Sequence, residues 1–314
     1  GITNLVGRNT KGLQIAGGIN HTMRSLEGVQ ISGIGNTVWD TLSGVQITYG
    51  VNVVKGGLRG VQISGTCNLA TQNVDGTQIS AGINVTPKDV RKAQISGTGN
   101  YARNVSGAQL SAGVNIARDT VGGGQVGFGG NYARHVTGGQ FSFGANIAPG
   151  KVSGGQIGFG LNYAGSVTGG QFSFGANVVP GTVEAGQIGF GLNYAGNITG
   201  GQFGFGINAV AGKAQGAQVG ALNFARHCSG GQLGLLNFSD SLSGYSIGLL
   251  SFSLKGYHRF DVITNDVMPL SAQFRTGTRG FHNILGYSPQ VEPGARWGFL
   301  YGIGTGQGSA RTVS

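Results

Sequence analysis

Charged residues are scarce in this sequence of 314 residues. They make up 10% of the chain, with 20 Lys and Arg against 10 Asp and Glu, whereas a soluble domain usually carries about 25%. Long apolar runs are also missing, because no stretch reaches the roughly 18 apolar residues that a membrane-spanning helix needs. The sequence therefore has neither the charge of an ordinary soluble surface nor a candidate transmembrane helix.

Patterns of catalytic or cofactor-binding residues are lacking as well. The acidic residues suggest no carboxylate pair, and the five histidines show no spacing that is typical of a metal site. With only two cysteines, Cys67 and Cys228, we expect no disulfide framework. The Gly-x-Gly matches lie inside strand-like segments, where they do not indicate a dinucleotide site. We expect no enzyme, with no catalytic, cofactor-binding or metal-binding residues and no cofactor.

The basic residues give the chain a net charge of +10, but they are scattered through turns and form no Lys/Arg run. Nucleic-acid-binding domains concentrate such residues on one helix or face. We therefore expect no nucleic-acid partner.

Glycine, by contrast, is abundant, with 65 residues, and it belongs to an internal repeat. A glutamine recurs every 15 or 16 residues from Gln14 to Gln218 and again at Gln232, and an asparagine follows most of these glutamines six positions later. In the best-formed repeat, residues 154–164, Ile157 and Phe159 alternate with Gln156 and glycine. This period of two predicts a β-strand with one apolar face and one small, polar face.

The segments between repeats alternate in length, which favours hairpins of two types. Gly-Asn at position 196 and Pro-Gly at position 149 are strong turn sequences. Closing these hairpins places Phe190 opposite Phe203 and Phe143 opposite Ile157, so that apolar residues meet. The sequence therefore favours an all-β fold, an antiparallel up-and-down meander closed as a large transmembrane β-barrel, because lipid can cover the apolar face and closure removes the edges.

In this interpretation residues 1–253 form a repeat region of about 16 strands, and residues 254–314 form non-repeat C-terminal strands of the same barrel. The alternative is a β-solenoid with one coil of about 15.5 residues per repeat. Stacked coils would align the Gln and Asn side chains into ladders. A straight strand of nine residues leaves too few residues for the return path, unless the chain turns a corner at a recurring glycine such as Gly144, Gly160 or Gly175.

The barrel interpretation assigns residues to three environments. The residues predicted to face lipid are Phe141, Phe143, Ile157, Phe159, Leu161, Phe172, Phe174, Ile188, Phe190, Leu192, Phe203 and Phe205. A girdle at the membrane interface is predicted from Tyr101, Tyr132, Tyr163, Tyr194, Arg103, Arg134 and Arg226. The residues predicted to face the lumen are Gln140, Gln156, Asn162, Gln171, Gln187, Asn193 and Gln202.

The function that follows is a non-enzymatic, porin-like pore or scaffold in the outer membrane of a Gram-negative bacterium, with membrane lipid as a partner. A wide barrel needs filling, so we expect the lumen to be filled or guarded by a plug segment or another envelope protein. The alternative fold predicts instead an extracellular surface protein for adhesion or assembly.

Two late repeats also resemble a known family. The segments GAQVGALNFA at residues 216–225 and GGQLGLLNFS at residues 230–239 are similar to the units of a bacterial surface-repeat family, G-[VL]-Q-[IL]-G-x-x-N-x-A. The later segments KGYHRF, at residues 255–260, and FRTGTR, at residues 274–279, resemble the tail of such proteins. The family is largely uncharacterised, and the resemblance implies a location in the envelope of outer-membrane-bearing bacteria. It implies no catalytic residues.

Overall fold

The computed structural model describes residues 1–264, 270–289 and 297–305, and their regular elements are all β-strands. The described residues contain no helix that could span a membrane. The chain divides into two compact units, Gly1–Gly175 and Ala176–Ser314, which are called unit 1 and unit 2.

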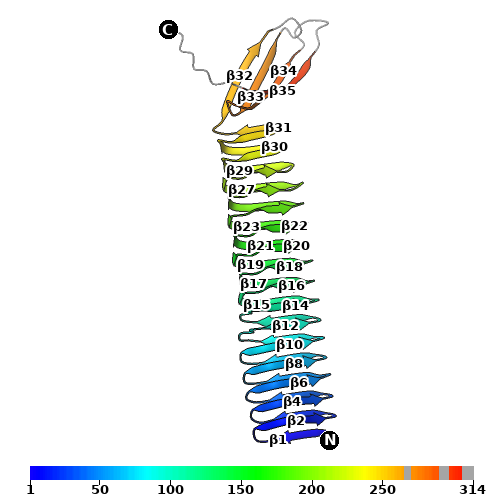
Figure 1. The fold of residues 1–314 in the computed structure, drawn as a ribbon. Helices are drawn as coiled ribbons and strands as arrows, with labels where there is room; N and C mark the ends of the chain where they lie inside the picture. The colour runs from blue at the N-terminus through cyan, green and yellow to red at the C-terminus, as the bar shows by residue number, and fades with distance from the viewer. Residues whose placement is uncertain (265–269, 290–296, 306–314) are drawn as a thin grey trace. The chain divides into compact units, whose positions relative to one another are not determined.

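Unit 1 is a stack of coils, each with two strands (Figure 1). Its strands are β1 (Thr3–Val6), β2 (Thr10–Ala16), β3 (Ile19–Thr22), β4 (Leu26–Ser32), β5 (Gly35–Val38), β6 (Leu42–Thr48), β7 (Val51–Val54), β8 (Leu58–Ser64), β9 (Cys67–Ala70), β10 (Val74–Ser80), β11 (Ile83–Thr86), β12 (Ala93–Ser96), β13 (Gly99–Ala102), β14 (Ala108–Ser111), β15 (Val114–Val121), β16 (Gln125–Gly127), β17 (Gly130–Val136), β18 (Gln140–Ser142), β19 (Ala145–Val152), β20 (Gln156–Gly158), β21 (Leu161–Val167) and β22 (Gln171–Ser173).

The prediction of an antiparallel barrel is wrong, because the strands of unit 1 pair in parallel. Each strand pairs with the equivalent strand of the next coil, so that β18 pairs with β20 and Phe141 lies beside Ile157. Phe143 does not face Ile157 across a hairpin. It stacks on Phe159, the same position of the next repeat, at 4.6 Å between ring centroids. The fold is the alternative β-solenoid. The transmembrane and porin-like interpretations, which depend on the barrel, are therefore wrong as well.

Two local features explain why hairpins were expected. The alternation over residues 156–164 is not one straight strand, because β20 ends at Gly158 and β21 begins at Leu161, with a corner between them. The alternating repeat length comes from an extra residue in every second coil. Between β19 and β21 the register shifts after Ala148, so that Pro149-Gly150 lies opposite the single residue Gly165. The Pro-Gly sequence therefore marks a β-bulge in a parallel pair.

Amide side chains form two ladders through the interior of the coils. Gln46 is fully buried, and its Nε2 donates to Oε1 of Gln30 in the preceding coil at 2.8 Å. The Asn ladder donates in the opposite direction along the stack, since Nδ2 of Asn52 donates to Oδ1 of Asn68 in the following coil at 3.0 Å. The same Nδ2 donates to the Ile63 carbonyl oxygen at 2.8 Å. Because a buried amide is costly without partners, these ladders specify the register of every coil.

Small and apolar residues fill the remaining interior. Val38 and Leu42 are fully buried in one early coil, and Ala148 and Val152 occupy the same positions in a later one. A Cβ on Gly158 would lie 2.7 Å from Oδ1 of Asn162, so glycine lets the Asn ladder approach the backbone.

Unit 2 begins with coils of the same kind and ends with a different sheet. Its strands are β23 (Ala176–Val183), β24 (Gln187–Gly189), β25 (Leu192–Ile198), β26 (Gln202–Phe203), β27 (Ile207–Ala214), β28 (Gln218–Val219), β29 (Leu222–Cys228), β30 (Gly231–Leu242), β31 (Tyr245–Ser253), β32 (Tyr257–Ile263), β33 (Ser271–Gly277), β34 (His282–Ser288) and β35 (Gly298–Gly304). The strands up to β31 pair in parallel. Phe203 lies beside Ile188 of the preceding coil, so the hairpin predicted to place it opposite Phe190 is absent.

Strands β32–β35 form a four-stranded antiparallel sheet rather than the last strands of a barrel. This sheet continues the hydrogen bonding of the Asn ladder. The ladder reaches Ser251 of β31, whose backbone N–H donates to Oδ1 of Asn283 at 3.0 Å. Asn283 Nδ2 and the Tyr301 hydroxyl both donate to the Gly248 carbonyl oxygen, at 3.0 and 2.8 Å. The sheet thus provides partners for the last coil, as terminal capping elements of repeat proteins do.

Candidate binding surface on the outside of the coils

The outer surface of unit 1 carries two columns of apolar side chains, which together are called the apolar stripe. The first column follows each glutamine and consists of Ile15, Ile31, Ile47, Ile63, Ile79, Ile95, Leu110, Val126, Phe141, Ile157 and Phe172. The second column lies at the corner and consists of Phe128, Phe143, Phe159 and Phe174, which stack with ring centroids 4.6 to 5.1 Å apart. Both columns repeat at the spacing of the coils.

Most of these side chains remain accessible to solvent. Ile157 is 48% exposed and Phe128 is 61% exposed. An aromatic side chain has roughly 150–250 Å² of surface. With about half of this area exposed on each, about ten such residues present roughly the 800 Å² per partner of a standard protein interface. Soluble monomers rarely expose so much contiguous apolar surface.

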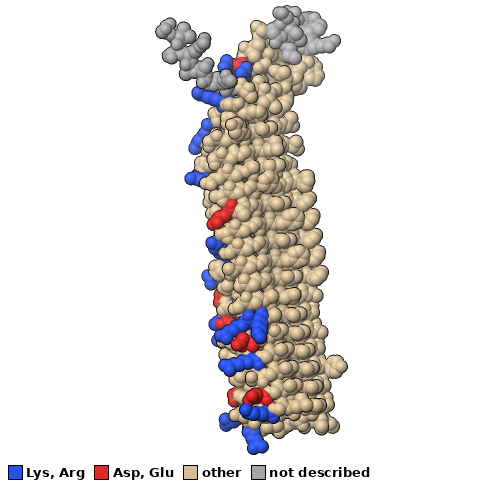
Figure 2. All heavy atoms as spheres, viewed as in Figure 1, with Lys and Arg blue, Asp and Glu red and all other residues tan. Residues whose placement is uncertain are grey.

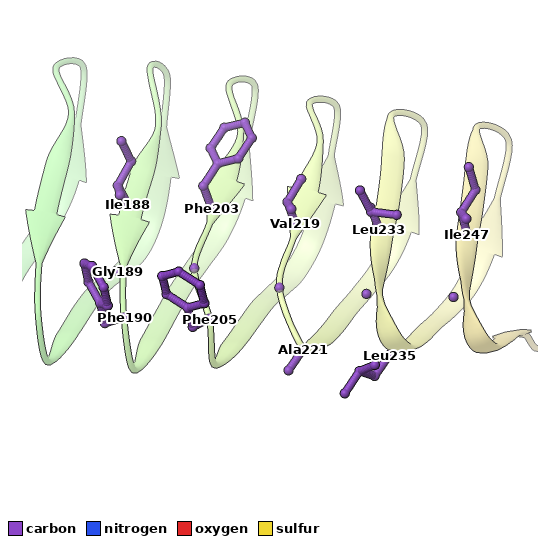
Figure 3. Close-up of a pocket in the computed structure, with 14 residues that line it drawn as sticks. Ile188, Gly189, Phe190, Phe203, Phe205, Val219, Ala221, Leu233, Leu235 and Ile247 are labelled. Atoms are coloured by element: carbon purple, nitrogen blue, oxygen red, sulfur yellow. The ribbon is translucent and has the colours of Figure 1, made fainter.

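Unit 2 carries the same two columns, and the space between them forms an apolar groove of about 620 Å³. Figure 3 shows one row from Ile188 and Phe203 to Ile247 and a second row that includes Phe190 and Phe205. The floor between the rows is the backbone of five glycines, Gly189, Gly204, Gly220, Gly234 and Gly248. The groove therefore offers apolar walls and a flat floor that side chains do not cover.

Charged side chains are segregated from this surface. Figure 2 shows Lys, Arg, Asp and Glu gathered along one edge of the coils in each unit, while the opposite edge is free of them in this view. The sequence has the same pattern, because no residue of either apolar column is charged. The coils are thus amphipathic in cross-section.

The residues predicted to face lipid lie on the outer side of the coils. Those of the apolar stripe are Phe141, Phe143, Ile157, Phe159, Phe172 and Phe174, and those lining the groove of unit 2 are Ile188, Phe190, Phe203 and Phe205. Leu161 and Leu192 begin β21 and β25 and are half-buried. The residues predicted to line a lumen, Gln140, Gln156, Asn162, Gln171, Gln187, Asn193 and Gln202, are buried inside the coils. The lumen itself is absent together with the barrel.

The predicted girdle is not a barrel rim. Tyr101, Ile116 and Tyr132 occupy one outer column on three successive coils, and Tyr163 and Tyr194 occupy equivalent positions further along the chain. Arg103 and Arg134 also share a column, and Arg226 has the equivalent position in unit 2. Consecutive turns of a barrel lie at opposite rims, so the barrel interpretation places Arg118 at the rim opposite Arg103 and Arg134. The signal that identifies Arg118 is the motif Asn-x-Ala-Arg, which occurs in three consecutive repeats.

The described residues offer little reactive chemistry. Cys67 and Cys228 are free. Burial raises the pKa of both thiols, to about 11 for Cys228, so the thiolate of Cys228 is scarce at neutral pH. No group of three or more His, Cys, Asp or Glu residues in the described part of the chain is placed to hold a metal ion.

Comparison with family models, with curated proteins and with solved structures yields no match to this chain.

Proposed function

We propose that this chain is a non-enzymatic β-solenoid of the cell surface that assembles with a second copy of itself through its apolar face. The observation that carries the proposal is the apolar stripe, which is exposed, uncharged and repeated on successive coils. Large exposed apolar patches are typical of surfaces that bind a partner.

The spacing of the stripe favours a second copy over an unrelated partner. Neighbouring strands lie about 4.8 Å apart, so the stripe presents an apolar side chain at this interval along the stack. A partner that contacts several coils needs side chains at the same interval, and another copy of this chain has them. In a symmetric pair the same patch serves on both sides.

The charge distribution also favours this pairing. With a net charge of +10, two copies repel each other unless their charges are kept apart. Because the charged side chains gather along the opposite edge of the coils, contact through the apolar faces places them at the outer sides of the pair (Figure 2).

Sedimentation velocity over a range of protein concentrations tests the proposal. We expect the wild-type protein to associate, and a variant with Phe143→Asp and Phe159→Asp to remain monomeric with an unchanged circular dichroism spectrum. The matched control carries Ser153→Asp and Ser166→Asp, which add the same charge outside the stripe, and we expect it to associate like the wild type.

A wild-type protein that is monomeric at every concentration would overturn the proposal, as would a control that dissociates as readily as the Phe variant. Wild-type monomers that float with lipid vesicles, while the Phe variant does not, would assign the stripe to a membrane surface instead of a second copy.

A further inference from the structure

Three arginines lie in one column on the charged edge of unit 1. Arg103, Arg118 and Arg134 each follow an alanine of the Asn-x-Ala-Arg motif, and those alanines are aligned on three successive coils. Since neighbouring strands are about 4.8 Å apart, the backbone of this column spans about 10 Å. The register shifts after Ala117, so that Arg118-Asp119 forms a bulge opposite Arg134. Proline occupies the equivalent position before and after it, at Pro87 and Pro149, so the run of arginines has defined ends.

These residues line a pocket of about 710 Å³. Lys88 adds a fourth cationic side chain, and Asp119 is the acidic residue that lines it. Tyr132 also lines the pocket and lies two residues before Arg134 in β17, on the same outer face of the strand. The pocket therefore combines several cationic groups with one aromatic ring and the two proline side chains at its ends.

Intramolecular ion pairs neutralise only part of this charge. Arg103 donates from Nε and Nη2 to the two carboxylate oxygens of Asp89, both at 3.0 Å. Among the described residues, Lys88, Arg118 and Arg134 form no ion pair within 4 Å. The pocket thus retains positive charge and guanidinium groups that are able to donate to a ligand.

We propose that this pocket binds a small ligand that carries at least two phosphate or sulfate groups. A guanidinium presents paired N–H donors that match the oxygens of such groups. The alanines that precede adjacent arginines lie about 5 Å apart, as the coil spacing dictates, so the guanidinium groups can reach neighbouring anionic groups of one ligand. The prolines that bound the column favour a small ligand over a long polyanion, and Tyr132 offers a flat surface for the body of the ligand. This site is separate from the apolar stripe and does not depend on self-association.

Calorimetric titration with inorganic triphosphate and with a sulfated disaccharide tests the proposal and distinguishes the two sources of the anionic groups. We expect one or both to bind with an affinity that falls as salt rises. Arg118→Gln with Arg134→Gln should weaken binding at least about tenfold, because hydrogen bonds to charged groups are lost. Arg118→Lys with Arg134→Lys should restore only part of the affinity, since an ammonium lacks the paired donors.

Arg226→Gln is the matched control. Arg226 occupies the same position of its coil in unit 2, but Ala211 precedes it and Asp240 follows it in that column. We expect this variant to bind as tightly as the wild type. Equal weakening by Arg226→Gln, unchanged binding in the double Gln variant, or binding only to vesicles of phosphatidylglycerol would each overturn the proposal.

Discussion

The early and the late coils of unit 1 use the same ladders but distribute their apolar residues differently. In the early coils, from β2 to β11, the interior holds pairs such as Val38 and Leu42. The corner position outside is small in most of these coils, as at Gly33 and Gly65, and Tyr49 is its one aromatic residue. In the late coils, from β16 to β22, the interior pairs shrink to alanine and valine, while the corner carries the stacked Phe column. Apolar volume has moved from the inside of the coil to the outside.

This difference separates residues that stabilise the coil from residues that are available to a partner. A fully buried leucine contributes about 1.5–3 kcal/mol through burial. Phe159, which is 42% exposed, gains only part of this in the isolated chain. The ladders and the close glycine packing therefore supply a larger share of the stability of the late coils, even if each ladder bond contributes the same amount in both regions. The aromatic column of the late coils is the part that a partner can cover.

The largest loss of stability is expected from breaking the Gln ladder, which the early and the late coils share. Gln46→Met in an early coil and Gln140→Met in a late coil each remove the partner of a buried amide oxygen on one neighbouring glutamine and of one N–H on the other. In the late coil, Nε2 of Gln156 keeps its bond to the Tyr163 carbonyl oxygen. Each unsatisfied group costs about 1–3 kcal/mol. We expect similar losses in the free energy of unfolding for the two variants, measured by urea denaturation. A much smaller loss in one region would show that its ladder is not needed for stability.

Truncation of a buried apolar side chain should cost more stability in the early coils than in the late coils. Leu42→Ala empties an early coil and should cost about 2–5 kcal/mol. Val152→Ala removes two carbon atoms from a late coil and should cost about 1.6 kcal/mol plus a small cavity contribution. Both residues are fully buried, so burial alone does not distinguish them. Equal losses in urea denaturation would contradict the idea that the early coils hold more of the apolar core.

A smaller effect is expected at the Phe column. Phe159→Ser removes ring contacts with both neighbours but no fully buried group. At about 0.5–1.5 kcal/mol for each of the two aromatic contacts, we expect it to cost less than Leu42→Ala. The measurement must be made at a concentration where the wild-type protein is monomeric, because self-association adds apparent stability. A loss as large as that of Leu42→Ala would mean that the column belongs to the core of the coil.

The same comparison explains which parts of the fold the sequence predicts. The repeat and the all-β class are confirmed, because the period of the Gln residues and the alternation around Gln156 are local properties of the chain. Strand direction is not local, since apolar residues align both in antiparallel hairpins and in stacked coils. Two patterns favour hairpins in isolation, the unbroken alternation over residues 156–164 and the turn sequence Pro149-Gly150. The first is interrupted by a corner between β20 and β21, and the second occupies a bulge beside Gly165.

The candidate surfaces were accessible to prediction only in part. The exposed Phe residues stand out in the sequence, but their burial against lipid was inferred from the barrel. The Arg column was divided, because a meander sends Arg103 and Arg118 to opposite ends, whereas coils align every equivalent position. The basic pocket could therefore be predicted only from the parallel pairing of the coils.

The smallest effect on stability is expected where the early coils give way to the late ones, at the ion pair of Asp89 with Arg103. Hydrogen bonding to the Arg103 guanidinium lowers the pKa of Asp89 from its ordinary value of 3.8. A lowered pKa in the folded state means that the stabilisation is complete above the ordinary pKa and is lost as the pH falls through the lower, folded value. We expect the difference in Tm between the wild type and Asp89→Asn to be small and constant from pH 7 to about 5, and to shrink below about pH 4.

The same substitution links this pair to the basic pocket. At neutral pH, Asp89→Asn removes the carboxylate that occupies the Arg103 guanidinium, so we expect tighter binding of triphosphate in calorimetric titration. Asp75→Asn is the control, because Asp75 pairs with Arg91 on the same exposed edge, and neither residue lines the pocket. If the two variants strengthen binding equally, net charge alone explains the gain. If only Asp89→Asn strengthens binding, Arg103 is a ligand-binding group like Arg118 and Arg134, and its pairing with Asp89 limits its contact with the ligand.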